Sequence, residues 1–174
     1  MLGFVSETHR GAAEPGQVDR LMAGAAEALR AAGWALAGVV QVNEPAAPDR
    51  PCHMDLHLLQ DQRVIRISQE LGALSQGCRL NTAGLEQAVG LVEQALQTRP
   101  NLLMINKFGK QEADGRGFRP LIGQAMVMEI PVLTGVSAEN TAAFLTFAED
   151  IAEAISPDIP SILRWFDRQT KERI

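Results

Sequence analysis

The sequence predicts an α/β protein with three layers, in which helices cover both faces of a mostly parallel sheet. Segments with strand character alternate with segments of helical periodicity along the 174 residues, and this alternation is typical of parallel sheets with crossover helices. Residues 102–105 are wholly apolar, as expected of a central strand that is covered on both faces. A chain of this length, 46% hydrophobic, is long enough for one core and short for two, so we expect one domain over residues 1–174.

The N-terminal part predicts a strand, a loop, a helix and a second strand. Residues 2–5 are apolar, and a polar stretch containing glycine and proline follows them. Gly33 is expected to end the helix in a left-handed conformation, and residues 35–42 predict the next strand. The apolar residues that recur at helical spacing before Gly33 are Val18, Leu21, Met22, Ala25 and Leu29.

Residues 52–68 predict an antiparallel hairpin inserted into this order, because two segments of alternating polarity flank a short polar connection. The pleat of the first segment places Cys52 on one face and His53, Asp55 and His57 on the other. We interpret Cys52 as a core cysteine and the opposite face as a polar outer face.

The second half of the chain continues the alternation. The last helix carries Trp165 and Phe166, which indicate a face packed against the rest of the protein. If these two side chains were exposed, they would instead indicate a contact between subunits. Whether the protein forms a homo-oligomer is left open by the sequence. The expected elements are a helix over 82–98 capped by Asn81 or Thr82, a strand over 102–105, a loop over 106–117, a helix opening near Pro120, a strand over 130–136, and helices over 138–155 and 160–172.

Net charge and hydropathy exclude several classes of function. Sixteen basic and 21 acidic residues give a net charge of −5, whereas a protein that binds the nucleic-acid backbone is expected to be basic. No run approaches the roughly 20 apolar residues that a membrane helix requires, and Arg10 lies where a signal peptide would continue its apolar stretch. We therefore expect a cytoplasmic protein with neither nucleic acid nor a membrane as its partner.

Basic residues gather in one stretch of this acidic chain. The chain contains three lysines, and two of them are Lys107 and Lys110. Residues 107–119 hold four basic and two acidic residues, which gives this segment a net charge of +2. It follows the apolar strand 102–105, and ligands of open α/β sheets bind beyond the carboxyl ends of the strands.

The loop after the first strand has the glycine spacing of a phosphate-binding loop. Gly11 and Gly16 match that spacing, but Gln17 and Val18 stand where the motif has a lysine and a hydroxyl residue. What remains is the backbone, whose N–H groups attract an anion at a helix N-terminus without any side chain. A chance match or a simple turn is the alternative interpretation.

The apolar strand 102–105 is followed directly by Asn106 and Lys107. Nucleotide hydrolases place acidic residues at such a strand end to hold Mg²⁺ and to orient water. An amide supplies no negative charge, and an ammonium group at neutral pH is no general base. Either Lys107, supported by Lys110 or Arg116, forms a metal-independent anion site, or these residues form a solvated basic loop that pairs with nearby carboxylates.

Residues 2–155 resemble a bacterial family of unknown function, which is itself distantly similar to the nucleoside-triphosphatases related to the thermophilic phosphohydrolase. The resemblance implies a P-loop-type topology. It also implies a link with molybdenum metabolism, with which the family is often associated. It is carried by short segments at residues 38–41, 52–56, 78–80, 105–112 and 131–136.

The resemblance also assigns roles by position. Asn106 matches the magnesium-binding aspartate and Lys107 matches the catalytic glutamate, so the parts that Mg²⁺-dependent hydrolysis needs are replaced. Gly11 and Gly16 match the phosphate loop. The positions that match residues retained in the hydrolases are Gly109, Lys110 and Glu112.

The sequence therefore predicts a protein that binds a nucleotide, such as ATP or GTP, or another small oxyanion, with little or no hydrolysis and with a regulatory or accessory role. Two alternatives stay open: an active nucleoside-triphosphatase that uses Glu112 or Asp114 for its metal, and a protein-interaction scaffold with a vestigial site. The residues predicted to bind the anion are Gly11, Gly16, Gln17, Asn106, Lys107, Gly109, Lys110 and Arg116.

A metal site is a separate hypothesis. Cys52 and Cys78 are the two cysteines of the chain, and they would hold a soft metal if the fold brought them together. The neighbouring His53 and His57 do not complete a cluster, because Cys52 is expected on the other face of its strand.

Overall fold

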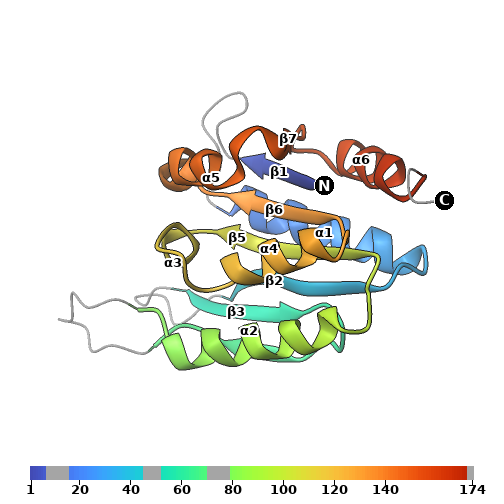
Figure 1. Cartoon of the computed structure of the whole chain (residues 1–174). Coiled ribbons are helices and arrows are strands. Elements are labelled where there is room, and N and C mark those ends of the chain that lie inside the picture. Colours follow the sequence, from blue (N-terminus) through green and yellow to red (C-terminus); the bar gives the residue numbers. More distant parts are fainter. Residues whose placement is uncertain (7–15, 45–51, 70–78, 172–174) are drawn as a thin grey trace.

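The computed structural model describes residues 1–6, 16–44, 52–69 and 79–171. Within these ranges, strands from both halves of the chain form one sheet in the order β4-β3-β2-β5-β6-β1-β7 (Figure 1). The strands are β1 (Leu2–Ser6), β2 (Leu36–Glu44), β3 (His53–Leu58), β4 (Val64–Arg66), β5 (Leu102–Phe108), β6 (Val132–Val136) and β7 (Ala152–Ala154). The helices are α1 (Gln17–Ala31), α2 (Thr82–Leu96), α3 (Lys110–Ala113), α4 (Arg119–Val127), α5 (Thr141–Ala148) and α6 (Ile159–Lys171), with short 3₁₀ turns η1 (Ala138–Asn140) and η2 (Glu149–Ile151).

The sheet is mixed but mostly parallel. Strands β2, β5, β6, β1 and β7 run parallel to one another, whereas β3 pairs antiparallel with both β2 and β4. The antiparallel part is the hairpin expected over residues 52–68. Both the α/β class and the mostly parallel sheet are therefore confirmed.

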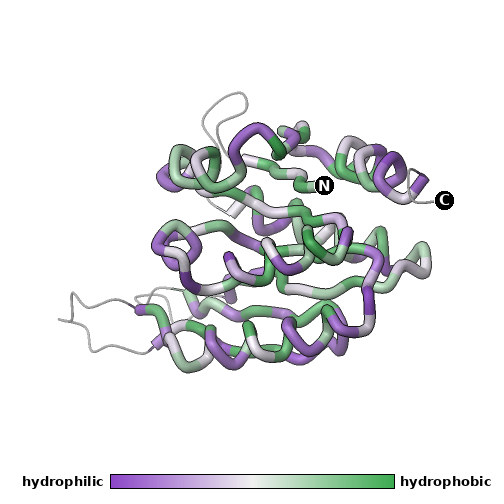
Figure 2. Tube along the Cα trace, viewed as in Figure 1, coloured by the Kyte–Doolittle hydropathy of each residue, from purple (hydrophilic) through white to green (hydrophobic). Residues whose placement is uncertain are grey.

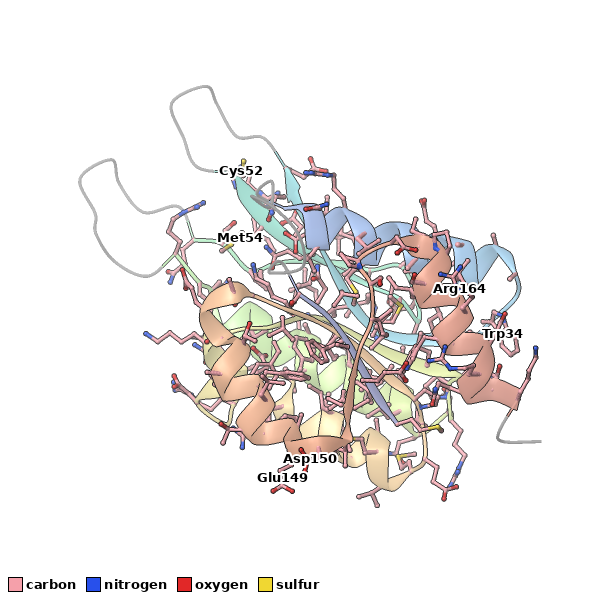
Figure 3. All side chains as sticks on the ribbon, turned by 90° about the horizontal axis from the view of Figure 1, so that it is seen from above. Trp34, Cys52, Met54, Glu149, Asp150 and Arg164 are labelled. Atoms are coloured by element: carbon pink, nitrogen blue, oxygen red, sulfur yellow. The ribbon has the colours of Figure 1, made fainter. Side chains whose placement is uncertain are left out.

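Helices cover both faces of this sheet. Helices α1 and α6 pack on one face, and α2, α4 and α5 pack on the other (Figures 1 and 3). Strand β5 faces both layers, because Leu103 and Ile105 belong to one buried cluster while Leu102 and Met104 belong to the other. This is the arrangement expected of a wholly apolar strand. Figure 2 shows the corresponding alternation of hydrophobic and hydrophilic residues along α2.

The expected ends of two helices are present. The α1 helix is followed by Gly33 at φ 86°, and the N–H of Trp34 donates to the carbonyl of Leu29 at 3.1 Å, as in a Schellman cap. At the start of α2, the side chain of Asn81 accepts a hydrogen bond from the N–H of Gly84 at 3.1 Å. Asn81 is therefore the N-cap, and Thr82 is the first helical residue.

Gly38 allows β2 and β5 to approach each other closely. Its φ is 112°, and a Cβ atom added there would lie 1.9 Å from the carbonyl oxygen of Met104. No L side chain tolerates either condition. The glycine in the Gly-Val-Val segment is therefore required by the pairing of β2 with the central strand.

The loop expected over residues 106–117 contains regular structure. Strand β5 continues to Phe108, and α3 occupies Lys110–Ala113. Asn106 and Lys107 thus belong to the strand. The extension is explained by pairing with β6, where Asn106 lies opposite Gly135 and Phe108 lies opposite Val136 after a register shift. Polar residues continue a strand when a neighbouring strand satisfies their backbone groups.

The helix expected over 138–155 ends early. Glu149 has a φ of 49°, which ends α5, and Ala152–Ala154 forms β7. This strand pairs in parallel with β1, and the N–H of Ile155 donates to the carbonyl of Phe4 at 2.8 Å. The open edge of β1 therefore decides the conformation of this alanine-rich segment against its helix propensity.

The interpretation of the β3 faces is wrong in two respects. Cys52 is exposed rather than part of the core, and Figure 3 shows it at the outer end of β3. Asp55 is buried, and it forms a two-pronged ion pair with Arg66 of β4 at 2.9 and 3.1 Å. A carboxylate paired in this way can be covered, so the face is not simply solvated.

The last helix packs into the molecule. Trp165 and Phe166 are 1% and 0% exposed, and the ring of Trp34 meets Phe166 edge-on with centroids 5.1 Å apart. The packed-face interpretation is confirmed. Within the described ranges, no helix combines the length and the apolar character that a bilayer span requires.

Candidate functional site

The carboxyl ends of the parallel strands lie at one edge of the sheet, where α3 follows β5 (Figure 1). Helix α1 begins at Gln17, and Gly16 precedes it with φ 75°. Gly16 has no side chain that could cap this N-terminus, so within the described residues no N-cap side chain satisfies the backbone N–H groups of the first turn. Gln17 is exposed, and Gly11 lies outside the described residues.

A polar network that is buried at Asp19, Gln41 and Asn106 and exposed at Asn43 joins three elements at this edge. The Nδ2 of Asn106 donates to one carboxylate oxygen of Asp19 at 3.1 Å, and the Nδ2 of Asn43 donates to the other at 3.1 Å. Gln41 in turn donates through Nε2 to the Oδ1 of Asn43 at 2.9 Å. Asp19 lies in the first turn of α1, where the helix dipole favours a negative charge.

The glycine at position 135 of β6 leaves room for the side chains of Val18 and Asn106. A Cβ atom at Gly135 would lie 3.2 Å from the Oδ1 of Asn106 and 2.7 Å from Val18. That oxygen is buried and accepts no hydrogen bond from the described residues. Asn106 therefore donates to Asp19 and retains one unused acceptor beside β6.

A cavity of about 180 Å³ lies beside Asn106. Its polar lining residues are Gln41, Asn106, Lys107, Lys110, Gln111 and Glu112, and Gly109 lies among them. The remaining wall is apolar and comes from β3, α2 and the segments beside them. Its apolar lining residues are Leu56, Ile67, Leu80, Leu85 and Phe118.

The two lysines border this cavity. Lys107 is half-buried and Lys110 is exposed. In the described part of the chain, neither lysine forms an ion pair with a carboxylate. Within that part of the chain, no carboxylate neutralises their positive charges.

The two carboxylates nearest to the lysines in the sequence, Glu112 and Asp114, make other contacts. Glu112 is buried, and its two oxygens accept the N–H groups of Gly109 and Phe118, each at 3.0 Å. Burial raises the pKa of the Glu112 carboxyl, and the two backbone N–H groups oppose that rise. Asp114 pairs with exposed Arg116 at 3.5 Å. Of the pairings that a solvated basic loop would form, that of Arg116 with Asp114 is present among the described residues.

The structure brings together some of the predicted site residues and separates others. The cavity wall contains Asn106, Lys107, Gly109 and Lys110. Gly16 and Gln17 lie at the start of α1, and Arg116 is likewise not among the lining residues. Cys78, like Gly11, lies outside the described residues.

Sequence reasoning missed the polar residues that connect α1 with the strand ends. Asp19 falls two positions after Gln17, and an acidic residue in the first turn of an expected helix was the available signal. Gln41 and Asn43 end an apolar strand with two amides at alternate positions. Polar side chains at that spacing share one face of a strand, so both point to the same site.

Hydrogen bonds hold the two buried carboxylates of Asp19 and Glu112 at this edge. Both oxygens of Asp19 accept side-chain amides, and both oxygens of Glu112 accept backbone N–H groups. Among the residues that the structure describes, no group of three or more histidine, cysteine, aspartate and glutamate side chains gathers in a way that could hold a metal. The arrangement can hold an anion at the lysines.

Comparison with known proteins gives the family. A family model described as "Protein of unknown function (DUF2478)" matches residues 11–165. The chain belongs to this family. The match includes the α1 N-terminus, the strand ends and the cavity wall. No solved structure matches the chain.

A curated protein also matches most of the chain. The chain is 35% identical over 157 residues to the "Molybdenum import ATP-binding protein ModC 2" of Bradyrhizobium diazoefficiens. The match covers 90% of the chain but only 17% of the relative. The chain thus spans about a sixth of the length of that ATP-binding protein.

Proposed function

We propose that this member of the family binds a small oxyanion or the phosphates of a nucleotide, and that it does not hydrolyse the nucleotide efficiently. The observation that carries this proposal is the pair Lys107 and Lys110 at the carboxyl end of the central strand β5, beside a cavity and without carboxylate partners in the described ranges. The uncapped N-terminus of α1 supplies further N–H groups at the same edge of the sheet.

The buried carboxylates support binding without hydrolysis. A nucleotide hydrolase needs a carboxylate that holds Mg²⁺ or orients water at the strand end. Here the strand end carries Asn106, and the neighbouring carboxylate of Asp19 is occupied by two amide donors. Ligand binding in this protein would therefore rest on fixed cations and backbone dipoles, without a bridging metal.

The curated relative suggests which anions to test. Its name joins ATP binding with molybdenum import, so ATP and molybdate are the first candidates, with GTP and phosphate beside them. Because the chain matches about a sixth of that relative, we propose an accessory or regulatory role for the corresponding segment rather than the ATPase activity of a whole transporter component.

Calorimetric titration with ATP, GTP, phosphate and molybdate, each with and without Mg²⁺, tests this function. We expect one of these ligands to bind without Mg²⁺, and Lys107→Ala to weaken its binding by about tenfold or more, the usual effect of removing one charged hydrogen-bond donor. Lys171→Ala is the matched control, because it removes the same charge from exposed Lys171 at the end of α6.

Two outcomes contradict the proposal. If none of the four ligands shows binding that Lys107→Ala weakens, the lysine pair is not an anion site. If purified protein hydrolyses ATP or GTP with Mg²⁺ at several turnovers per second, near the usual range for enzymes, the protein is an active nucleoside-triphosphatase.

A further inference from the structure

The cavity beside β5 is lined by two chemically different kinds of residue. Its apolar residues are well buried and belong to separate elements: Leu56 of β3 is 2% exposed, Leu85 of α2 is 6% exposed and Phe118 before α4 is 3% exposed. The residues that line it also include Lys107 and Lys110. A ligand that fills this space therefore lies among apolar side chains and next to two residues with positively charged side chains.

The charge of these two lysines is not balanced within the described site. Glu112 also lines the cavity, but its two oxygens accept backbone N–H groups. Neither lysine is paired with a carboxylate in the described ranges. Half-buried Lys107 interacts with an anion in a medium of lower dielectric constant than water, which strengthens the attraction.

The size of the cavity limits what it can hold. Its volume of about 180 Å³ equals the liquid volume of about six water molecules. Pockets for drug-sized ligands are larger, at roughly 300–1,000 Å³. A whole nucleoside triphosphate does not fit inside, whereas a short hydrocarbon group does.

We propose that the cavity binds a small organic carboxylate with an apolar body. The carboxylate lies at Lys107 and Lys110, and the body lies among Leu56, Leu85 and Phe118. This inference rests on the proposed function, because it uses the same lysines, and it names the class of ligand that they take. Hydrocarbon burial adds affinity that an inorganic oxyanion of the same charge does not gain.

Three small molecules test the carboxylate and the apolar body of the ligand separately. Hexanoate carries both the carboxylate and the body, acetate carries the carboxylate with a single methyl group, and 1-hexanol carries the body without the charge. In NMR titrations of the full chain, we expect hexanoate to bind at least about tenfold more tightly than either of the others, since each buried methylene contributes to binding. The shifted amides should be those of residues 106–112.

Two variants test the two kinds of lining residue. Lys107→Ala should weaken hexanoate binding about tenfold while Lys171→Ala leaves it unchanged. Leu80→Phe enlarges a half-buried side chain of the apolar wall and should abolish hexanoate binding. Leu163→Phe makes the same change at half-buried Leu163 of α6 and should have no effect. Thermal unfolding of each variant shows whether it folds, and the lysine variant tests the site independently of the cavity-filling one.

The outcomes distinguish this inference from the proposed function. Equal affinities for hexanoate and acetate, or hexanoate binding that Lys107→Ala does not weaken, overturn the carboxylate ligand. If phosphate, molybdate or a nucleotide binds through Lys107 and hexanoate does not, this inference is wrong and the proposed function stands. If hexanoate alone binds through Lys107, the anion site of the proposed function stands, and its ligand is an organic carboxylate rather than a nucleotide or an inorganic oxyanion.

Discussion

The carboxylate of Asp19 lies in the first turn of α1 and accepts one amide N–H on each oxygen, from Asn106 and from Asn43. Asp19 is 8% exposed and Asn106 is 2% exposed. A buried charge is costly unless hydrogen bonds replace its hydration. The two amides supply such bonds, so they stabilise the carboxylate of Asp19 between α1 and the ends of β2 and β5.

Asp19→Asn tests this network. An asparagine at position 19 accepts only one of the two amide donors, and its own NH₂ group then faces the second amide NH₂. We expect the free energy of unfolding to fall by about 1–3 kcal/mol, the cost of an unsatisfied buried donor. The measurement is urea unfolding monitored by circular dichroism.

Asp167→Asn is the control for this substitution, because Asp167 is exposed on α6. It should change the unfolding free energy by less than about 0.5 kcal/mol. Equal effects of the two substitutions would show that the amides do not stabilise the Asp19 carboxylate.

At the scale of single elements, α3 shows how one side chain holds a connection in place. The helix has four residues, too few to be stable by itself. Glu112 accepts the N–H of Gly109 before the helix and the N–H of Phe118 after it. The segment between β5 and α4 is thereby closed around a buried carboxyl group, and Lys110 at its start is held beside the cavity.

The pH dependence of stability tests this role of Glu112. Burial raises the pKa of Glu112 above its ordinary value of 4.5, so the folded protein binds its proton more tightly than the unfolded chain does. Its contribution is therefore fully present below about pH 4.5 and is lost as pH rises through the raised value. We expect the unfolding free energy of the wild type, relative to Glu112→Gln, to fall as pH increases over this window.

The comparison uses urea unfolding of both proteins at a series of pH values. Glutamine does not titrate, and it accepts only one of the two N–H groups, which adds an offset that does not depend on pH. The hydrogen bond with Arg66 lowers the pKa of Asp55, so the contribution of Asp55 to the unfolding free energy changes with pH in the opposite direction. This contribution is the same in both proteins. A difference that stays constant or grows with pH would contradict a raised pKa at Glu112.

At the scale of the whole molecule, α6 completes the layer that α1 begins. Trp165 lies against Gly3 of β1, where an added Cβ atom would come within 2.7 Å of the indole ring. The absence of a side chain at Gly3 therefore makes room for the tryptophan. The last helix is thus packed on the same sheet that carries the candidate site, in contact with its first strand.

Trp165→Ala tests whether α6 belongs to one cooperative unit with the sheet. The side chain is 1% exposed, so we expect a loss of about 3–5 kcal/mol in the free energy of unfolding. Leu145→Ala on α5, where the side chain is 47% exposed, should cost less than about 1 kcal/mol.

Calorimetry and circular dichroism should show a single unfolding transition for both variants. A separate transition for the C-terminal helix in Trp165→Ala would mean that α6 is stabilised independently of the sheet.

Much of the fold was predictable from local patterns. Three elements could be predicted because the residues that indicate them lie close together in the chain. They are the helix before Gly33, the hairpin over 52–68 and the apolar strand that begins at Leu102. Periodicity and capping depend on neighbours in the chain. The signal failed at Ala152–Ala154, where alanine and glutamate favour a helix but β1 offers an open edge.

Part of the candidate site was also predictable. Lys107 and Lys110 were indicated by a local reversal of charge at the end of a buried strand. Asp19 and its two amide partners were not, because Asn106 is 87 residues away from it and Asn43 is 24 residues away. Such contacts depend on strand order and register, which no local pattern records.

The sequence by itself determined the alternation of strands and helices, the doubly covered central strand and the position of the two lysines. Only the tertiary structure decided that Asp19 is satisfied by amides, that Cys52 is exposed and that apolar residues line one cavity together with the lysines. The physical reason is that hydrophobic periodicity and charge act within one segment, whereas the environment of a side chain is made by several segments that meet only when the sheet assembles.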